Sequence, residues 1–456
     1  MLIWKASSLN INLASLRYRC LIPLHYLELC GYKSCIYSNC DEIKFNKKLD
    51  VIIFVKSFKR EDLDIAKKAH KLGVPIIIDI CDNIFIEEYT TRIDNIPSEN
   101  FKEMAKVASA IVTTGIVLEN VIRAEIGESI PIFIIPDGNE TLEDVKQAMN
   151  CIKWTRWIKI AIYRPTSFLL VLKSVFEVKF ISLYKQFYPK IMQIYKKNIS
   201  GIKVRLSRLR SQIEVNETTL TERKFNVSEK TLTSNAILPF TFFIKSKDIK
   251  QQVIDKSISS KLSKHSKLGN NLLIAKDVKR IIWFGHHGAS YGNFGMLNIL
   301  DIAEHLIKTS NEINFTLLVV SNNYEKYSKH ILPLPFSTEY IDWDPINIYQ
   351  HISQSDVTIV PNSKTPFSIG KSANRTVLSL SLGVPVVATK TPALKNFQNC
   401  IMCDEWEQGL RVYLTDHHLV NKHIEMAQSI IKQNYSGEAI ATQWANVINR
   451  VTGKVV

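Results

Sequence analysis

The feature that most constrains the fold is an alternation between short, uniformly apolar runs rich in β-branched residues and longer stretches with helical periodicity. In the first part of the chain the apolar runs are Asp50–Phe54, Val74–Ile80, Ala110–Thr113 and Pro131–Ile135. Between the first two, Arg60–Leu72 spaces its apolar residues for one buried helix face. Strands that are apolar on both faces must be covered on both sides, so the alternation predicts a parallel sheet flanked by helices.

The pattern stops near Asn139 and returns at Arg280. The second set of predicted strands is Arg280–Phe284, Phe315–Val320, Val357–Val360 and Val384–Ala388, with helices over Met296–Thr309 and Thr376–Leu382. We therefore predict two doubly wound α/β domains, 1–140 and 279–456, separated by an insert, 141–278. Loops at the carboxyl ends of the two sheets are expected to face a cleft that binds a ligand.

The charge of the chain predicts an anionic partner. Lys and Arg number 58 against 43 Asp and Glu, a net charge of +15. Residues 151–280 hold 27 of the basic residues and 8 of the acidic ones. The net positive charge of this segment therefore exceeds that of the whole chain. The basic character therefore belongs to the insert.

The insert is basic, aromatic and predicted to be mainly helical. Between Lys153 and Arg210 there are 14 basic residues and one acid, Glu177, interleaved with aromatic residues. A helix over Ser167–Lys197 would be amphipathic, which favours an anionic membrane surface as the partner of residues 151–210. A solvated helical hairpin packed on its own domains is the main alternative, and nucleic-acid binding is the less favoured one. Ser211–Ser266, rich in Ser, Thr, Lys and Asn, is typical of a linker.

Targeting and metal signals are weak in this sequence. The first residues lack an apolar stretch of signal-peptide length, and no uncharged apolar run approaches the roughly 20 residues of a spanning helix. We therefore expect a cytoplasmic protein, peripheral on the inner face of the plasma membrane if the insert binds lipid. Cys400 and Cys403 have the spacing of a metal-binding pair, but no second pair accompanies them, so no metal site is predicted.

The strongest candidate for a chemical site is the segment Pro366–Arg375, PFSIGKSANR, at the start of a predicted helix. Backbone amides and the positive end of a helix dipole attract an anion, and Lys371 and Arg375 would add full charges. A diphosphate is the natural occupant of such a site.

With its surroundings, this segment resembles the GT-B glycosyltransferases that use sugar nucleotides. The resemblance covers nearly all of residues 1–140 and 279–456, which it implies are two Rossmann-like domains. It is carried by SLRYR at Ser15–Arg19, DICDN at Asp79–Asn83, IIPDG at Ile134–Gly138, WFGHHG at Trp283–Gly288, SDVTIVP at Ser355–Pro361, PFSIGKSANR at Pro366–Arg375 and the following GVPVVA.

The resemblance implies a donor diphosphate on the second domain and an acceptor on the first. Lys371 and Arg375 would then neutralise the diphosphate as it leaves. No metal or cofactor is expected, because protein cations and a helix end replace the metal, and retention of configuration is implied. The donor-binding residues that follow are Gly285, His286, His287, Gly288, Ser368, Gly370, Lys371, Ser372, Asn374 and Arg375.

Two features depart from the family pattern. Leu378 occupies the place where many members carry a glutamate that holds the ribose hydroxyls. His286 and His287 replace a basic pair that members often place after the first strand of the second domain. Either another residue holds the ribose, or the donor is not an ordinary nucleotide sugar.

On the first domain, two aspartates and two arginines are candidates for acceptor chemistry. Asp79 and Asp82 end a predicted strand and could act as the base or orient an acceptor hydroxyl, with a turn-capping role as the alternative. Arg17 and Arg19 precede a predicted helix and could grip an acceptor phosphate or carboxylate. Ordinary surface charge at a helix start is the other interpretation of both arginines.

Taken together, the sequence favours a hexosyltransferase-like enzyme. It would move a sugar from a nucleotide-activated donor to a lipid-linked or polysaccharide acceptor, in cell-envelope or surface glycan synthesis. A non-catalytic GT-B protein that binds sugar nucleotides or partner proteins is the alternative from another class. An epimerase or phosphorylase on the same fold and a nucleic-acid-binding module are less favoured.

Overall fold

A computed structural model describes residues 1–43, 45, 49–86, 97–150, 152, 278–285 and 295–453. By their contacts, residues 1–146 and 240–456 form one compact unit and residues 147–239 form a second. Nearly all of the second unit lies outside the described residues, and so do the predictions made for the basic aromatic insert. The domain boundaries at residues 140 and 279 stay predictions.

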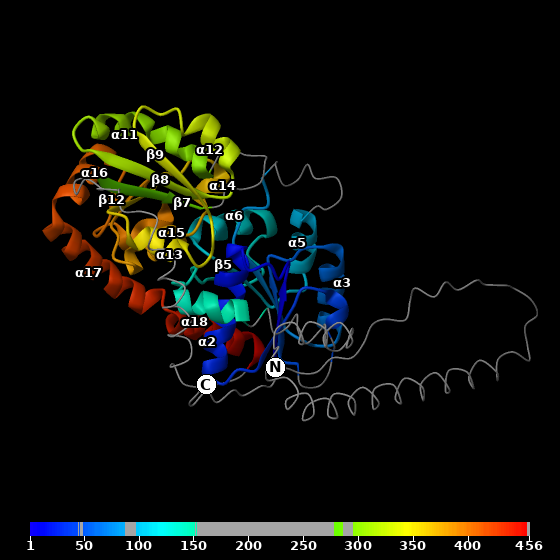
Figure 1. Ribbon diagram of the computed structural model, residues 1–456. Helices are drawn as coiled ribbons and strands as arrows, with labels where there is room; N and C mark the ends of the chain where they lie inside the picture. The colour runs from blue at the N-terminus through cyan, green and yellow to red at the C-terminus, as the bar shows by residue number, and fades with distance from the viewer. Residues whose placement is uncertain are drawn as a thin grey trace, which may run out of the picture. The chain divides into compact units, whose positions relative to one another are not determined.

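The first half of the chain forms a six-stranded sheet in the order β2-β1-β3-β4-β5-β6 (Figure 1). Every neighbouring pair is parallel. The strands are β1 (Leu2–Ala6), β2 (Ser34–Tyr37), β3 (Val51–Val55), β4 (Ile76–Ile80), β5 (Ala110–Thr113) and β6 (Ile132–Ile134). The helical segments are α1 (Ala14–Leu16), the π-helical turn η1 (Arg17–Leu21), α2 (Ile22–Leu29), the short turn η2 (Cys40–Glu42), α3 (Arg60–Lys71), α5 (Pro97–Ala105) and α6 (Ile116–Ile126).

The second half forms another six-stranded parallel sheet, in the order β12-β11-β10-β7-β8-β9. Its strands are β7 (Lys279–Phe284), β8 (Phe315–Ser321), β9 (Ser337–Asp342), β10 (Val357–Val360), β11 (Val386–Ala388) and β12 (Met402–Cys403). Its helical segments are η4 (Gly295–Ile302), α11 (Ala303–Ser310), α12 (Tyr324–His330), α13 (Ile348–Ser353), α14 (Pro366–Ile369), α15 (Asn374–Ser381), η5 (Pro392–Phe397), α16 (Trp406–Thr415), α17 (His417–Asn434) and α18 (Gly437–Thr452).

The prediction of two parallel, doubly wound sheets is confirmed. Strands β3 and β4 are buried along their whole length, as expected from sequences that are apolar except for Asp79 of β4. One predicted helix is divided: Met296–Thr309 consists of the 3₁₀ segment η4 followed by α11. Ile302, at the junction, has φ −118° and ψ 11°, which interrupts the helical geometry.

Each sheet supplies its own hydrophobic core. In the first half, β3 and β4 pack against α3 and α5, with Phe54, Leu63 and Phe101 among the buried side chains. In the second half, Trp283 of β7 and Val319 of β8 belong to one core. None of the helices that the structure describes has both the length and the apolarity needed to cross a membrane.

The last helix of the chain contacts the first half. Helix α18 packs on α2, and Trp444 meets Trp4 of β1 edge-to-face at a centroid separation of 5.1 Å (Figure 1). Gly437 begins α18 so close to α2 that a Cβ atom there would overlap the Tyr26 ring. A glycine is therefore required at residue 437 by close approach and not by backbone conformation.

We predict that Gly437→Ala lowers the free energy of unfolding by about 1 to 3 kcal/mol, the usual effect of overpacking a well-packed contact. Tyr26→Ala in the same chain should restore part of this loss, because it removes the ring that the new methyl group meets. Urea denaturation measures both effects. Gly115→Ala is the control, since its Cβ would enter open space, and a similar loss there would contradict the explanation.

Candidate anion-binding site

The order of the second sheet places a topological switch point between β7 and β10. Counted from β7, the strands run 3-2-1-4-5-6, so the direction of winding reverses between these two strands. Ligands of open parallel sheets bind outside the carboxyl ends of the strands at such a switch point. Gly285 follows β7 there with φ 151°, a backbone conformation that favours glycine. Its amide donates to the Val320 carbonyl at 3.0 Å.

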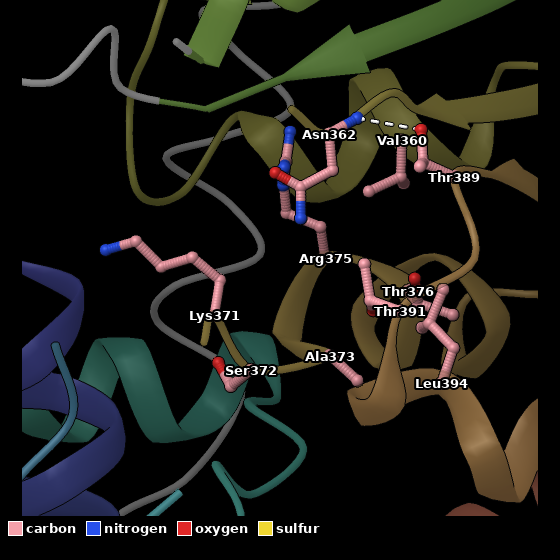
Figure 2. A pocket seen from close by; sticks show the side chains of 10 residues that line it. All are labelled: Val360, Asn362, Lys371, Ser372, Ala373, Arg375, Thr376, Thr389, Thr391 and Leu394. Carbon is pink, nitrogen blue, oxygen red and sulfur yellow. Dashed lines mark hydrogen bonds between the residues drawn. The ribbon is translucent and has the colours of Figure 1, made fainter. Parts of the chain in front are cut away.

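A small pocket lies at this edge of the sheet (Figure 2). Its polar lining residues follow β10 or β11, or belong to the loop before α15 and its first turn: Asn362, Lys371, Ser372, Arg375, Thr376, Thr389 and Thr391. The backbone amide of Asn362 donates to Thr389 Oγ1 at 3.0 Å, which joins the ends of β10 and β11. The volume of this open pocket is about 20 Å³, which is room for about one water molecule.

Arg375 is the unusual charge of this pocket. In the part of the chain that the structure describes, no carboxylate forms an ion pair with it, although it is half-buried. Burial lowers its pKa to about 10. Its guanidinium lies over the Trp283 ring at 5.7 Å, and its side chain passes beside Gly285. A cation held this way is prepared to receive an anion, because no internal partner must be displaced first.

The side-chain hydroxyl of Thr376 is a second polar group of the pocket without an internal partner among the described residues. Its side chain is 1% exposed and lines the pocket, yet Oγ1 has no hydrogen-bond partner among the described residues. Buried hydroxyl groups in folded proteins are almost always bonded to protein or water. The residue lies in the first turn of α15, where backbone amides also lack intrahelical partners. The pocket therefore offers hydrogen-bond donors beside an uncompensated positive charge.

The structure brings some predicted donor residues together and separates others. Lys371, Ser372 and Arg375 line the pocket, whereas Gly370 and Asn374 lie beside these residues in sequence without lining it. Ser368 belongs to the short helix α14, is buried, and accepts from Asn362 Nδ2 through its carbonyl at 3.0 Å. The predicted residues His286, His287 and Gly288 lie outside the described residues.

Four polar pocket residues were missing from the predicted set: Asn362, Thr376, Thr389 and Thr391. Each lies within three residues of the end of β10 or β11, or in the first turn of α15. Their position just after a predicted strand was the available signal, since strand ends of a parallel sheet meet at one edge. Their residue types are too common in turns to have marked them alone.

Asp79 and Arg19 form a buried ion pair in the first half. Arg19 Nη2 donates to Asp79 Oδ1 at 2.5 Å, and Nη1 donates to the Ile135 carbonyl at 2.7 Å and to Asp137 Oδ1 at 3.4 Å. Both members of the pair are almost fully enclosed. Burial raises the pKa of Asp79 despite the opposing charge of Arg19. Proton removal and acceptor binding need contact with a ligand, and this side chain pair has almost no exposed surface to offer.

Arg17 is also engaged inside the protein. Its Nε donates to Glu140 Oε1 at 2.5 Å, and its guanidinium lies over the ring of Trp343 at 5.3 Å. Burial by itself lowers the pKa of Arg17, but the Glu140 carboxylate raises it above its ordinary value. Acceptor binding by Arg17 and Arg19 stays a prediction, while the contacts of both residues are those of structural ion pairs.

Asp82 connects the first half to the pocket loop. Its Oδ1 accepts from Lys371 Nζ and its Oδ2 accepts from Lys56 Nζ. Burial alone raises the pKa of Asp82, but these two ammonium groups hold it well below its ordinary value. A carboxylate that binds its proton so weakly is a poor general base. The predicted role of Asp82 in proton removal therefore gains no support from its surroundings.

A second bond between the halves involves Asp137. Its Oδ2 accepts from Ser372 Oγ at 2.5 Å, while its other oxygen accepts from Arg19. Asp82 and Asp137 thus hold two consecutive residues of the pocket loop, Lys371 and Ser372. The loop before α15 is positioned by carboxylates from the first half.

Comparison with known proteins identifies the architecture. No family model and no curated protein sequence matches the chain. The structure of Anabaena HepE in complex with UDP matches with a TM-score of 0.50 and 12% identity, over 98% of this chain and 99% of that one. Sucrose-phosphate synthase from Thermosynechococcus elongatus matches with a TM-score of 0.52 and 9% identity, over the full length of both chains. The chain has the GT-B fold.

Leu378 bears on how a GT-B protein of this sequence could hold a ribose. The resemblance noted in the sequence implies that Leu378 replaces a ribose-binding glutamate, and the structure leaves Leu378 5% exposed on the buried face of α15. It does not line the pocket. A ribose bound by this GT-B protein must therefore be held by other residues.

We predict that Arg19→Met lowers the free energy of unfolding by about 3 to 5 kcal/mol, the effect of leaving one member of a buried ion pair uncompensated. The uncompensated charge would be that of Asp79. Chemical denaturation measures the change, with Arg60→Met as a control at an exposed arginine, where about 0.5 kcal/mol or less is expected. Equal losses in the free energy of unfolding in the two variants would mean that the ion pair of Arg19 and Asp79 stabilises the fold no more than an exposed arginine does.

Proposed function

We propose that the chain is a nucleotide-sugar-dependent glycosyltransferase whose second-half pocket binds the diphosphate of the donor. The observation that carries the proposal is Arg375, a half-buried cation at the β7/β10 switch point that forms no ion pair with a described carboxylate. The unpartnered hydroxyl of Thr376 and the start of α15 lie beside it. Together they supply the charge and the hydrogen-bond donors that a phosphate requires.

The fold supports this choice of ligand. One protein with the same architecture was crystallised with UDP, and another is a sucrose-phosphate synthase. In the proposed reaction, Arg375 and the first turn of α15 stabilise the charge that develops on the departing diphosphate. Lys371 adds a second cation when it reaches the ligand. These groups stabilise the transition state more than the ground state, which is what accelerates glycosyl transfer.

A lipid-linked or polymeric acceptor at a membrane surface is the finer part of the proposal. Its support is the sequence of residues 151–210, with 14 basic residues and one acidic residue among many aromatic ones. Anionic lipid attracts such a segment by roughly 1 kcal/mol for each cation near the surface. The place of action would be the inner face of the plasma membrane, and the product a surface glycan.

We expect Arg375→Gln to weaken donor binding by roughly 10- to 150-fold, the loss of 1.5 to 3 kcal/mol for a hydrogen bond to a charged group. The measurement is a thermal-shift and calorimetric screen against UDP, GDP, ADP, CMP and TDP sugars. Lys364→Gln removes an exposed charge from the same segment and is the matched control. A donor that binds Arg375→Gln as tightly as the wild type would exclude this pocket as the diphosphate site.

Thr376→Val separates binding from folding. Replacing a buried, unpartnered hydroxyl by an isosteric methyl group should leave the free energy of unfolding unchanged or raise it by about 1 kcal/mol. Donor affinity should fall by about tenfold, since a hydrogen bond to the ligand phosphate is lost. A parallel loss of stability and affinity would instead indicate that Thr376 is bonded within the protein.

Transfer itself distinguishes the enzyme from a non-catalytic GT-B protein. With the donor found in the screen, the enzyme should release nucleoside diphosphate in the presence of a glycan or lipid-linked acceptor. Binding without release under any acceptor condition would favour the non-catalytic alternative. Sedimentation of the full chain with anionic vesicles, but not with neutral ones, would support the membrane part, and competition by DNA would count against it.

A further inference from the structure

Asp82 stands between two cations that come from different halves of the protein. Lys56 follows β3, and Lys371 belongs to the loop before α15; each donates to a different oxygen of the Asp82 carboxylate. The carboxylate is 9% exposed, whereas the two lysine side chains are 31% and 39% exposed. The anion is therefore fixed in the protein, and its cations keep one side toward solvent.

The position of Lys371 matters for any ligand of the pocket. Figure 2 shows the Lys371 side chain directed away from Arg375, although its residue lines the same pocket. Its ammonium also lies 3.9 Å from the centroid of the Phe367 ring. Asp82 thus holds the second cation of the pocket away from the first. A phosphate bound near Arg375 would meet Lys371 only after this carboxylate had given it up.

Lys56 makes such an exchange feasible. It lies at the β1/β3 switch point of the first sheet, where the strand order reverses. Its φ of 47° is a left-handed backbone conformation that residues other than glycine rarely adopt. Its amide donates to the Asp79 carbonyl at 2.9 Å. A carboxylate as enclosed as Asp82 is costly to leave unpaired. With Lys56 in place, Asp82 keeps one counter-ion when Lys371 leaves.

We propose that Asp82 is an internal counter-anion that a ligand phosphate displaces from Lys371, and that Lys56 sets the affinity by holding Asp82 after the exchange. This inference rests on the proposed anion-binding function of the pocket. The opposite role, in which Asp82 holds Lys371 ready for the ligand, predicts the opposite effect of removing the carboxylate. The two roles are therefore separable by one substitution.

The probe is inorganic pyrophosphate, with UDP as a second ligand, titrated calorimetrically into the full chain at low and high salt. Asp82→Asn should tighten binding by about three- to tenfold, because the competing anion is gone. The gain should shrink at high salt. Asp64→Asn, which removes the same charge from an exposed position on α3, is the control and should leave affinity unchanged.

Lys56→Gln tests the second half of the proposal. In the wild-type background it should weaken pyrophosphate binding severalfold, because Asp82 then has no counter-ion once Lys371 leaves. In the Asp82→Asn background the same substitution should have almost no effect, since contacts that work as a unit are not additive. Equal weakening in both backgrounds would mean that Lys56 touches the ligand directly, and would overturn the exchange.

The remaining outcomes separate this inference from the proposed function. Binding that depends on Arg375 but is weakened or unchanged by Asp82→Asn would overturn the inference alone. Tighter pyrophosphate binding by Asp82→Asn without any glycosyl transfer would leave the inference standing and remove the transferase. No binding in either protein would overturn both. Should Asp82→Asn fail to fold, unchanged affinity in Lys56→Gln would by itself overturn the exchange.

Discussion

The enclosed guanidinium group of Arg19 is the constraint on which the arrangement of the described site residues depends. A charged group without water must have acceptors on every side. For Arg19 these come from the end of β4 through Asp79, from the Ile135 carbonyl, and from Asp137. The ends of two strands of the first sheet, β4 and β6, are thereby fixed relative to η1. Because Asp137 also accepts from Ser372, the same cation restrains the loop that precedes α15.

The sequence was sufficient for the strands that are buried on both faces. β3 is uniformly apolar, and β4 and β10 each carry one polar residue in an otherwise apolar run, which is typical of strands in a parallel sheet covered on both faces. It was insufficient for β1, where Lys5 interrupts the apolar pattern. That lysine is buried because Asp62 of α3 lies 2.9 Å away, a partnership that only the folded chain creates. β9 was also not predicted, because it is an edge strand whose residues are all exposed or partly exposed.

The residues of the candidate site also fall into two groups, those whose role the sequence could predict and those whose surroundings it could not. Lys371 and Arg375 could be predicted because a glycine and two cations before a helix have a local physical meaning. The environments of Asp79, Asp82, Arg17 and Arg19 could not be, since each depends on a partner far away in the sequence. Arg17 and Glu140 are separated by 123 residues, and Asp82 and Lys371 by 289. A residue type at a strand end indicates a possible site, whereas its ion pairs decide whether the charge is available to a ligand.

Charge availability also bears on which anion the pocket would select. Arg17 and Arg19 are neutralised by enclosed carboxylates, and Lys371 is paired with Asp82. Arg375 forms no ion pair with a described carboxylate, so no internal ion pair would have to break for it to meet an anion, but a single partly exposed charge contributes little to affinity. In the proposed function, a diphosphate would carry enough charge to engage Arg375 and still compete with Asp82 for Lys371. A carboxylate or a chloride ion would not. The internal pair at Asp82 would therefore favour ligands of high charge density over monoanions.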